Sequence, residues 1–239
     1  MPLIVLPNAF GDAVTNMALD AALLGNLSPH TAIFRHYGWT EPTITFGYAQ
    51  PIKAVQASVP INLRLCRRLT GGGIVDHRND WTYALMIQSK LPAAQLPPTQ
   101  LYSIIHRCLQ QALQRQLIDS RLAPCPQTCE SSVRSAIGSP QQCFVQATAN
   151  DVMRPDGVKI AGAAMKRTRE GLLVQGSINR VVLPDEFDLH AFASGFQQML
   201  SEQLAIPIDT MEAIHQLFNR GLIESERRRF ESTAWQSRR

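Results

Sequence analysis

The stretch RRLTGGGIVDH, residues 67–77, places two arginines, three successive glycines and a histidine in one short segment. Glycine has no side chain and accepts positive φ angles, so three in a row let the backbone approach a ligand closely. Such a run is costly inside a helix or strand, because glycine loses the most conformational freedom on folding. The flanking segments, INLRLC at 61–66 and IVDHRNDWTYALMI at 74–87, are strand-like. The sequence therefore predicts a binding loop between two strands.

The composition is that of an ordinary globular chain. The 239 residues are 45% hydrophobic and 18% charged, which is enough apolar material for one large domain or two small ones. No window approaches the roughly 18 continuous apolar residues of a membrane span. The first residues, MPLIVLPNAFGD, are too few and too poor in basic residues for a signal peptide. We therefore expect a cytoplasmic protein with no membrane partner.

The cysteines and the charges exclude two further classes of function. Five cysteines are an odd number, which argues against a complete disulfide framework, and no histidine or second cysteine pair stands at metal-ligand spacing. We expect no metal site. The net charge is only +4, but the C-terminal segment ERRRFESTAWQSRR is basic and would suit an acidic protein partner. Because no nucleic-acid-binding motif accompanies it, we expect no nucleic-acid partner.

Hydrophobic periodicity predicts an α+β domain with a mixed sheet. Strands are expected at 3–6, 31–38, 43–49, 81–88, 143–153, 158–167 and 171–179, with the strands at 143–153 and 158–167 forming a hairpin through the turn Pro155-Asp156-Gly157. Helices are expected at 15–24 with Thr15 as N-cap, at 98–117 after Pro97, and near 189–204 and 210–231 with Asp188 and Asp209 as N-caps.

The glycine run fits none of the common phosphate-binding motifs. A P-loop needs lysine directly after its last glycine, where this chain has Ile74, and the dinucleotide spacing G-x-G-x-x-G is absent. The chain also lacks the G-x-S-x-G turn of serine hydrolases.

A second candidate for chemistry is the segment CFVQATANDVMRPDGVKIAGAAMKR at 143–167. Lys159 follows a Pro-Asp-Gly turn and precedes small residues, which leave room beside the strand for a linear ligand. It could equally be a solvated lysine at a strand end. Cys143 could be an inert buried thiol or, near a lysine that lowers its pKa, a nucleophile.

Six segments together resemble successive motifs of the lipoate–protein ligase and octanoyltransferase family. In chain order they are NMALDAALL (16–24), FGYAQ (46–50), RRLTGGGIVDH (67–77), KIAGAAMKR (159–167), LLVQGSI (172–178) and FESTAWQSRR (230–239). The resemblance implies a catalytic fold similar to that of biotin protein ligase and class II aminoacyl-tRNA synthetases, in which helices flank a mixed β-sheet.

The resemblance also implies roles for individual residues. The glycine loop lines a tunnel for an acyl or lipoyl chain, and His77 sits just beyond the pocket. The lysine that matches Lys159 binds the acyl carbonyl, or the phosphate of an acyl-adenylate, and stabilises the oxyanion as the acceptor attacks. The expected substrate-binding residues are Arg68, Thr70, Gly71, Gly72, Gly73, His77, Gly162 and Ala163.

Members of this family use one of two chemistries. Single-domain octanoyltransferases take the acyl group from acyl carrier protein and use a cysteine upstream of the lysine, which Cys143 resembles. They need no cofactor and pass the group to a lysine of a lipoyl domain or of the glycine-cleavage H protein. Lipoate ligases activate lipoate with ATP and Mg, and they usually carry a further C-terminal domain or partner subunit. Since this chain stops at Arg239, we expect a single catalytic domain over 1–239.

Three alternatives stay open at this point. The Cys143 thioester mechanism is favoured, with the ATP-dependent ligase second. Ala21 and Gln175 stand where relatives often have Glu and His, and ANDV at 149–152 is similar to an Asn-Asp pair of ligases. The third alternative is a non-catalytic acyl-binding relative, against which the presence of both Lys159 and Cys143 argues.

Overall fold

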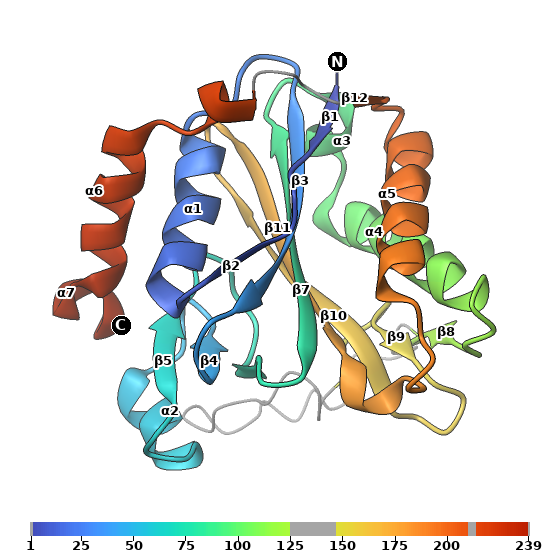
Figure 1. The fold of residues 1–239 in the computed structure, drawn as a ribbon, viewed down its shortest axis with the longest axis horizontal. Helices are drawn as coiled ribbons and strands as arrows, with labels where there is room; N and C mark the ends of the chain where they lie inside the picture. The colour runs from blue at the N-terminus through green and yellow to red at the C-terminus, as the bar shows by residue number, and fades with distance from the viewer. Residues whose placement is uncertain (1, 125–146, 210–213, 239) are drawn as a thin grey trace.

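The computed structural model describes residues 2–124, 147–209 and 214–238, which contain two β-sheets (Figure 1). The larger sheet has the order β12-β1-β3-β7-β11-β10-β9-β8, with β2 paired to β3. At one end of this sheet the pairing is parallel: β1 pairs with β12 and with β3, and β2 pairs with β3. From β3 onward, through β7, β11, β10, β9 and β8, every pairing is antiparallel. The expected mixed sheet is confirmed. Its strands are β1 (Leu3–Val5), β2 (Ala9–Gly11), β3 (Ala32–Trp39), β7 (Asp80–Gln88), β8 (Arg121–Leu122), β9 (Val152–Met153), β10 (Lys159–Arg167), β11 (Gly171–Asn179) and β12 (Ile208–Asp209).

The smaller sheet has the order β5-β4-β6 and carries the glycine loop between two of its strands. Its strands are β4 (Thr43–Phe46), β5 (Arg64–Arg67) and β6 (Val75–Asp76), and α2 (Ile52–Ser58) packs against it. The loop at 68–74 thus connects β5 to β6 across the middle strand β4. The prediction of a binding loop between two strands agrees with this connection.

The helices follow the predicted pattern except at two N-caps and at the start of the last long helix, which was expected near residue 210 but begins at Arg220, after a 3-10 turn at Ile214–Leu217. Asp12, not Thr15, caps the first helix by accepting from the Thr15 backbone N–H. Asp209 is not a cap, because it lies in the extended strand β12 paired to β1. Asn219 caps the last long helix instead. The helices are α1 (Ala13–Gly25), α3 (Pro92–Gln95), α4 (Pro98–Gln114), α5 (Leu189–Leu204), α6 (Arg220–Glu231) and α7 (Thr233–Gln236). Of the helices in the described ranges, none is long and apolar enough to cross a membrane.

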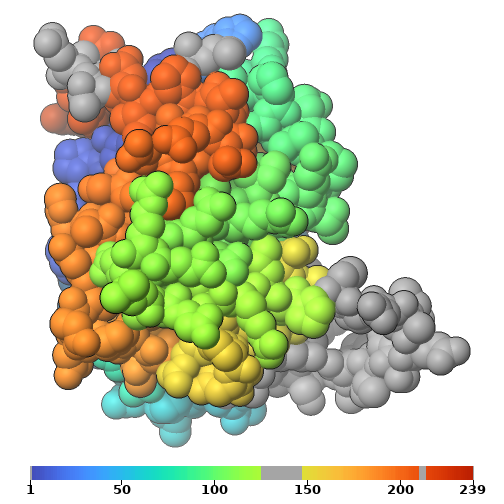
Figure 2. Space-filling view, turned by 90° about the vertical axis from the view of Figure 1, so that its right-hand side faces the viewer, coloured from blue at the N-terminus to red at the C-terminus, as the bar shows by residue number. Residues whose placement is uncertain are grey.

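Strand β7 separates two hydrophobic cores. Its residues Trp81, Tyr83, Leu85 and Ile87 face the core beneath α4 and α5, as the alternation predicts. Ala84 and Met86 face the opposite core, which α1 and α6 cover. Figure 1 shows the two helical layers on either side of the sheet, and Figure 2 shows α4 and α5 covering one side of the molecule.

The C-terminal helix α7 is fixed to the smaller sheet by the buried Arg67. The Arg67 backbone N–H donates to Gln236 Oε1 at 3.0 Å, and its guanidinium donates to the Gln236 carbonyl at 2.9 Å. In return, Trp235 Nε1 donates to the Arg67 carbonyl at 3.1 Å. The guanidinium also donates to the carbonyl of Gln50 at 2.8 Å. This guanidinium therefore joins α7 to the segment that follows β4.

Replacing Trp235 with alanine is expected to lower the free energy of unfolding by about 3–5 kcal/mol, as for other buried large aromatic residues. Trp235 is 4% exposed and packs edge-on against Phe230. Urea denaturation measures the change. As a control, Ile61→Ala removes a fully exposed side chain and should change stability by less than about 0.5 kcal/mol. Equal midpoints for the two variants would contradict the anchoring of α7.

Candidate active site

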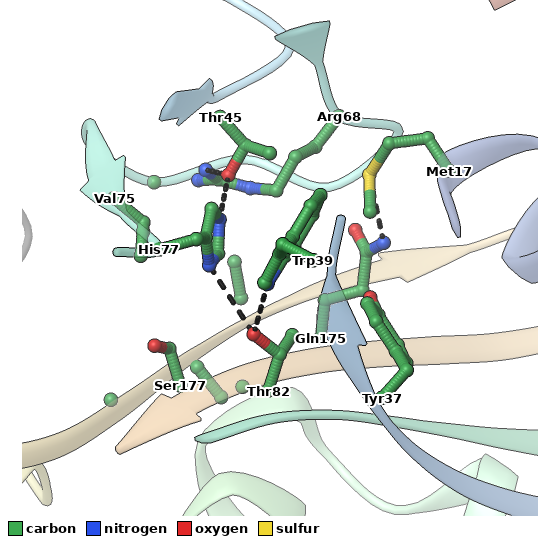
Figure 3. Close-up of a pocket in the computed structure, with 15 residues that line it drawn as sticks. Met17, Tyr37, Trp39, Thr45, Arg68, Val75, His77, Thr82, Gln175 and Ser177 are labelled. Carbon is green, nitrogen blue, oxygen red and sulfur yellow. Dashed lines mark hydrogen bonds between the residues drawn. The ribbon is translucent and has the colours of Figure 1, made fainter. Parts of the chain in front are cut away.

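A pocket opens where the glycine loop meets the larger sheet (Figure 3). It encloses about 410 Å³, its open mouth included. The strands β3, β7, β10 and β11 form one wall, and the other wall comes from α1, β4, the glycine loop and the segment that follows it. The lining residues are Met17, Tyr37, Trp39, Thr45, Arg68, Gly72, Val75, His77, Thr82, Gly162, Ala163, Ala164, Gln175, Gly176 and Ser177. Much of this surface is apolar, which suits a hydrocarbon chain.

Arg68 holds the glycine loop in shape. Its guanidinium donates to the carbonyls of Gly71 and Gly73, each at 2.9 Å. Gly72 lies between them with φ of +85°, a conformation that favours glycine. A side chain at Gly47 would lie 2.0 Å from the Gly72 carbonyl, so the loop also rests directly on the backbone after β4.

His77 forms part of the pocket wall, not a position just beyond the pocket, and its proton arrangement follows from its partners. Thr45 Oγ1 accepts from Arg68 at 2.8 Å and lies 2.7 Å from His77 Nε2. Because the Asp80 carboxylate can only accept a hydrogen bond, His77 Nδ1 carries a proton and donates to Asp80 Oδ2 at 2.7 Å. The Trp39 ring stacks on the imidazole at 4.1 Å, which fixes its plane.

Gln175 connects the glycine loop to a buried ion pair. Its Oε1 accepts from the Thr70 hydroxyl at 2.7 Å, and its Nε2 donates to Asp20 Oδ2 at 2.7 Å. The Asp20 carboxylate pairs with Arg35 at 2.7 Å and is fully buried. Thr70 thus shapes the loop through a hydrogen bond and does not itself line the pocket.

Lys159 lies at the start of β10 beside the pocket, where it forms a buried ion pair. Its Nζ is 2.7 Å from Asp151 Oδ2, and the two side chains are 4% and 0% exposed. The lysine crosses over Gly162, because a Cβ added there would meet Lys159 Cε and Nζ at 2.7 Å. Gly162 is also part of the pocket wall. The ammonium therefore lies against the pocket and not at a solvated strand end.

The Asp151 carboxylate accepts further hydrogen bonds from two other segments. The backbone N–H of Thr148 donates to its Oδ2 at 2.6 Å, and the Tyr102 hydroxyl donates to its Oδ1 at 2.5 Å. Asn150 precedes it in the left-handed region, with φ of 68°. The Asn-Asp pair in the sequence thus forms a tight turn that directs the carboxylate toward Lys159.

Two of the five cysteines can be excluded as nucleophiles. Cys66 and Cys108 are buried and unbonded to each other, and burial raises the pKa of each thiol to about 12. Neither is a thiolate at neutral pH. Cys125, Cys129 and Cys143 lie outside the described residues. Within the described ranges, no cluster of His, Cys, Asp and Glu could hold a metal ion.

The structure brings most of the predicted site residues together. Of the expected set, Arg68, Gly72, His77, Gly162 and Ala163 line one pocket, and Lys159 lies against it. Thr70, Gly71 and Gly73 do not line the pocket, but they hold the loop in shape through their hydrogen bonds to Gln175 and Arg68.

Sequence reasoning missed several residues that form or support this pocket. The spacing HRND at 77–80 could have indicated Asp80 as the partner of His77. No signal in the sequence marked Tyr102, which lies in a predicted helix between the apolar positions Leu101 and Ile104. Met17, Tyr37, Trp39, Thr45 and Asp151 were also not assigned to the site.

Comparison with known proteins identifies the family. Residues 12–219 match the lipoyl protein ligase A/B catalytic domain. The chain belongs to this family. It is 31% identical over 193 residues to octanoyltransferase LipM of Halalkalibacterium halodurans, covering 77% of this chain and 68% of that protein. It is 34% identical over 181 residues to LipM of Oceanobacillus iheyensis, covering 72% and 62%. The chain is an enzyme of this family, and it spans about two thirds of the length of these relatives.

Solved structures of the family share the fold. The crystal structure of lipoate-protein ligase A bound with ATP superposes with a TM-score of 0.70 at 17% identity, covering 99% of this chain and 98% of that one. The bi-partite lipoate protein ligase of Thermoplasma acidophilum gives 0.68 at 17% identity, covering 99% and 96%. The expected fold class is therefore confirmed.

The buried His106 predicts a loss of stability in mild acid. Burial lowers the pKa of this imidazole from 6.5 to about 4, so the unfolded chain binds a proton there at a pH where the folded chain does not. The contribution of the neutral, buried His106 to the free energy of unfolding is fully present above about pH 6.5. It falls by about 3 kcal/mol as the pH decreases to about 4. Urea midpoints between pH 4 and 7 should show a weaker pH dependence in His106→Leu. As a control, His215→Gln changes an exposed histidine and should show the same pH dependence as the wild type. If all three proteins show the same pH dependence, His106 is not the cause of the loss of stability in acid.

Proposed function

We propose that the enzyme is an octanoyltransferase that moves an octanoyl group from acyl carrier protein to a lysine of a lipoyl-domain protein. The observation that carries the proposal is the pairing of a narrow, mostly apolar pocket with the buried ammonium of Lys159 at its edge. The named octanoyltransferase relatives at 31% and 34% identity support the choice of acyl group. The ligase structures, at 17% identity, support the fold alone.

The pocket walls suit an unbranched acyl chain. Polar side chains in these walls are hydrogen-bonded to other protein groups: Thr45 to His77, and Gln175 to Thr70 outside the lining. Such groups demand no polar partner from a ligand, so a hydrocarbon chain leaves none of them unsatisfied. Small residues at Gly162, Ala163 and Ala164 leave the opposite side open for the chain.

Lys159 acts on the acyl carbonyl in this mechanism. Its ammonium is held against the pocket wall by Asp151, in a site from which water is largely excluded. Negative charge develops on the carbonyl oxygen when a nucleophile attacks, and a fixed cation beside it lowers that barrier.

Cys143 is the proposed nucleophile. Its thiolate attacks the carrier thioester, an acyl–sulfur bond forms on Cys143, and the carrier thiolate leaves and takes up a proton. The acceptor amine, having lost one proton, then attacks the Cys143 thioester. The amide forms as the nitrogen gives up its second proton to solvent, the carbon–sulfur bond breaks, and the Cys143 thiolate is released. The burial of Cys66 and Cys108 supports a nucleophile among the other three cysteines, of which Cys143 matches the family pattern. This route needs neither ATP nor a metal ion.

The thioester can be detected directly. Wild-type enzyme mixed with octanoyl-carrier protein, without ATP, should gain one octanoyl mass, and hydroxylamine should remove it. Cys143→Ser should show neither the labile adduct nor turnover, because the hydroxyl is a far weaker nucleophile. Intact-mass spectrometry reads the result, with Cys66→Ala as the buried-thiol control that keeps the adduct. If transfer instead requires ATP, and Cys143→Ala remains fully active, the thioester mechanism is wrong. The enzyme would then be a lipoate ligase that uses Mg and ATP.

Removing the charge of Lys159 should stop transfer while the pocket remains. Lys159→Met is expected to lower kcat by about 10²–10³, the usual effect of losing one oxyanion donor. It also leaves the buried Asp151 without its cation, so the variant should be less stable. The double variant with Asp151→Asn removes both charges and should regain stability without regaining activity. Steady-state kinetics and thermal melts separate the two effects, and full transfer by Lys159→Met would exclude the proposed role.

A further inference from the structure

We infer that the Tyr102 hydroxyl is a positioning group for the reaction: it holds the Asp151 carboxylate, and through it the Lys159 ammonium, against the pocket. The inference rests on the proposed function for what Lys159 does, but not for how it is held. Tyr102 lies on α4, a helix that packs with α5 on one face of the larger sheet and contributes no residue to the pocket lining. Among the hydrogen bonds of the described residues, the one from the Tyr102 hydroxyl is the only one that joins this helix to the Lys159–Asp151 ion pair.

The Tyr102 oxygen joins two strands of the site at once. It accepts the backbone N–H of Ala163 at 3.2 Å and donates to Asp151 Oδ1 at 2.5 Å. Ala163 belongs to the pocket wall on β10, and Asp151 directly precedes β9. The regular pairing of these two strands shifts register between Lys159 and Ala161. The hydroxyl therefore links β10 to the residue before β9, just beyond the last paired residues Ala161 and Val152.

The direction of the proton in this bridge is fixed. Burial, followed by the nearby Asp151 charge, raises the pKa of the Tyr102 phenol, so the phenol keeps its proton. Because its oxygen already accepts from Ala163, its hydrogen is directed to the carboxylate. Asp151 thus accepts from Tyr102 on one oxygen and from Lys159 on the other. Only the ionised carboxylate can accept from both.

The charged and titratable groups around Asp151 come from three elements. Lys159 faces it from β10, Tyr102 and His106 from α4, and Tyr83 from β7. His106 stays neutral near pH 7, because burial lowers its pKa to about 4, and its ring packs against Tyr102 at 3.9 Å. Its Nδ1 lies 3.0 Å from the Tyr102 carbonyl. Removal of the Tyr102 hydroxyl would therefore leave the carboxylate without a replacement donor from these groups.

The consequence is a measurable change in both charges of the pair. Without the hydroxyl, the buried carboxylate loses a donor that stabilises its negative charge. Lys159 then faces a partner whose charge is less well stabilised. In Tyr102→Phe we expect kcat to fall about ten-fold, the usual effect of one hydrogen bond to a charged group. We expect KM for the octanoyl carrier to be unchanged and the acidic limb of the pH–rate profile to move to higher pH.

The matched control is Tyr83→Phe. Tyr83 is also a buried tyrosine near the pair, but its hydroxyl has no partner among the described residues. Removing it should leave the rate, the pH profile and the charges of the pair as in the wild type. Thermal melts of both variants establish that each is folded at the assay temperature.

A second measurement follows Lys159 without using activity. The chain has only four lysines, Lys53, Lys90, Lys159 and Lys166, so the Lys159 side-chain Cε signal can be assigned by its loss in Lys159→Arg. Its NMR titration should shift to lower pH in Tyr102→Phe and further in Asp151→Asn. A uniform fall in rate at every pH, with an unmoved Lys159 titration, would mean that Tyr102 only fills space. An inactive wild type would refute octanoyl transfer, while the titration would still decide the role of Tyr102.

Discussion

The guanidinium of Arg68 is the contact on which the rest of the pocket depends. It binds the carbonyls on both sides of Gly72 and the hydroxyl of Thr45, and so joins the glycine loop to the smaller sheet. Thr45 in turn hydrogen-bonds His77 Nε2 at 2.7 Å, and the imidazole donates from Nδ1 to the Asp80 carboxylate. One cation therefore holds the shape of the loop and connects it, through Thr45, to the hydrogen bonds along one wall.

The opposite wall obeys a steric constraint. Lys159 and Asp151 meet over β10 beside Gly162, where a Cβ would lie 2.7 Å from the lysine and 3.1 Å from the carboxylate, so any side chain there would force the pair to shift. The small residues after Lys159 were interpreted from sequence as room for a ligand. The structure gives Gly162 a second purpose, which is room for the side chain of Lys159 itself.

Much of the fold could be predicted, because long periodic segments determine their own structure. Strand β10 and strand β11 begin and end close to where alternation placed them, and Trp81 to Ile87 face one core as predicted. Local capping was harder: Asp209 has a capping side chain, but pairing of β12 with β1 holds it in a strand. The Lys159–Asp151 pair depends on a turn at Asn150, and Tyr102 reaches it from 49 residues away. No local pattern contains such a contact.

The two walls of the pocket also differ in what supports them. Lys159 and Gln175 stand on the larger sheet, which is packed on both faces by extensive cores. Thr45 and Arg68 belong to the smaller sheet and its loop, whose own core, among the described residues, is a small cluster of four buried apolar side chains: Ile44, Phe46, Val55 and Ile74. Regions with few buried contacts open at a lower free-energy cost than the global fold. The smaller sheet can therefore unfold locally and take one wall of the pocket with it, so that hydrogen exchange and loss of activity precede the cooperative unfolding of the larger sheet.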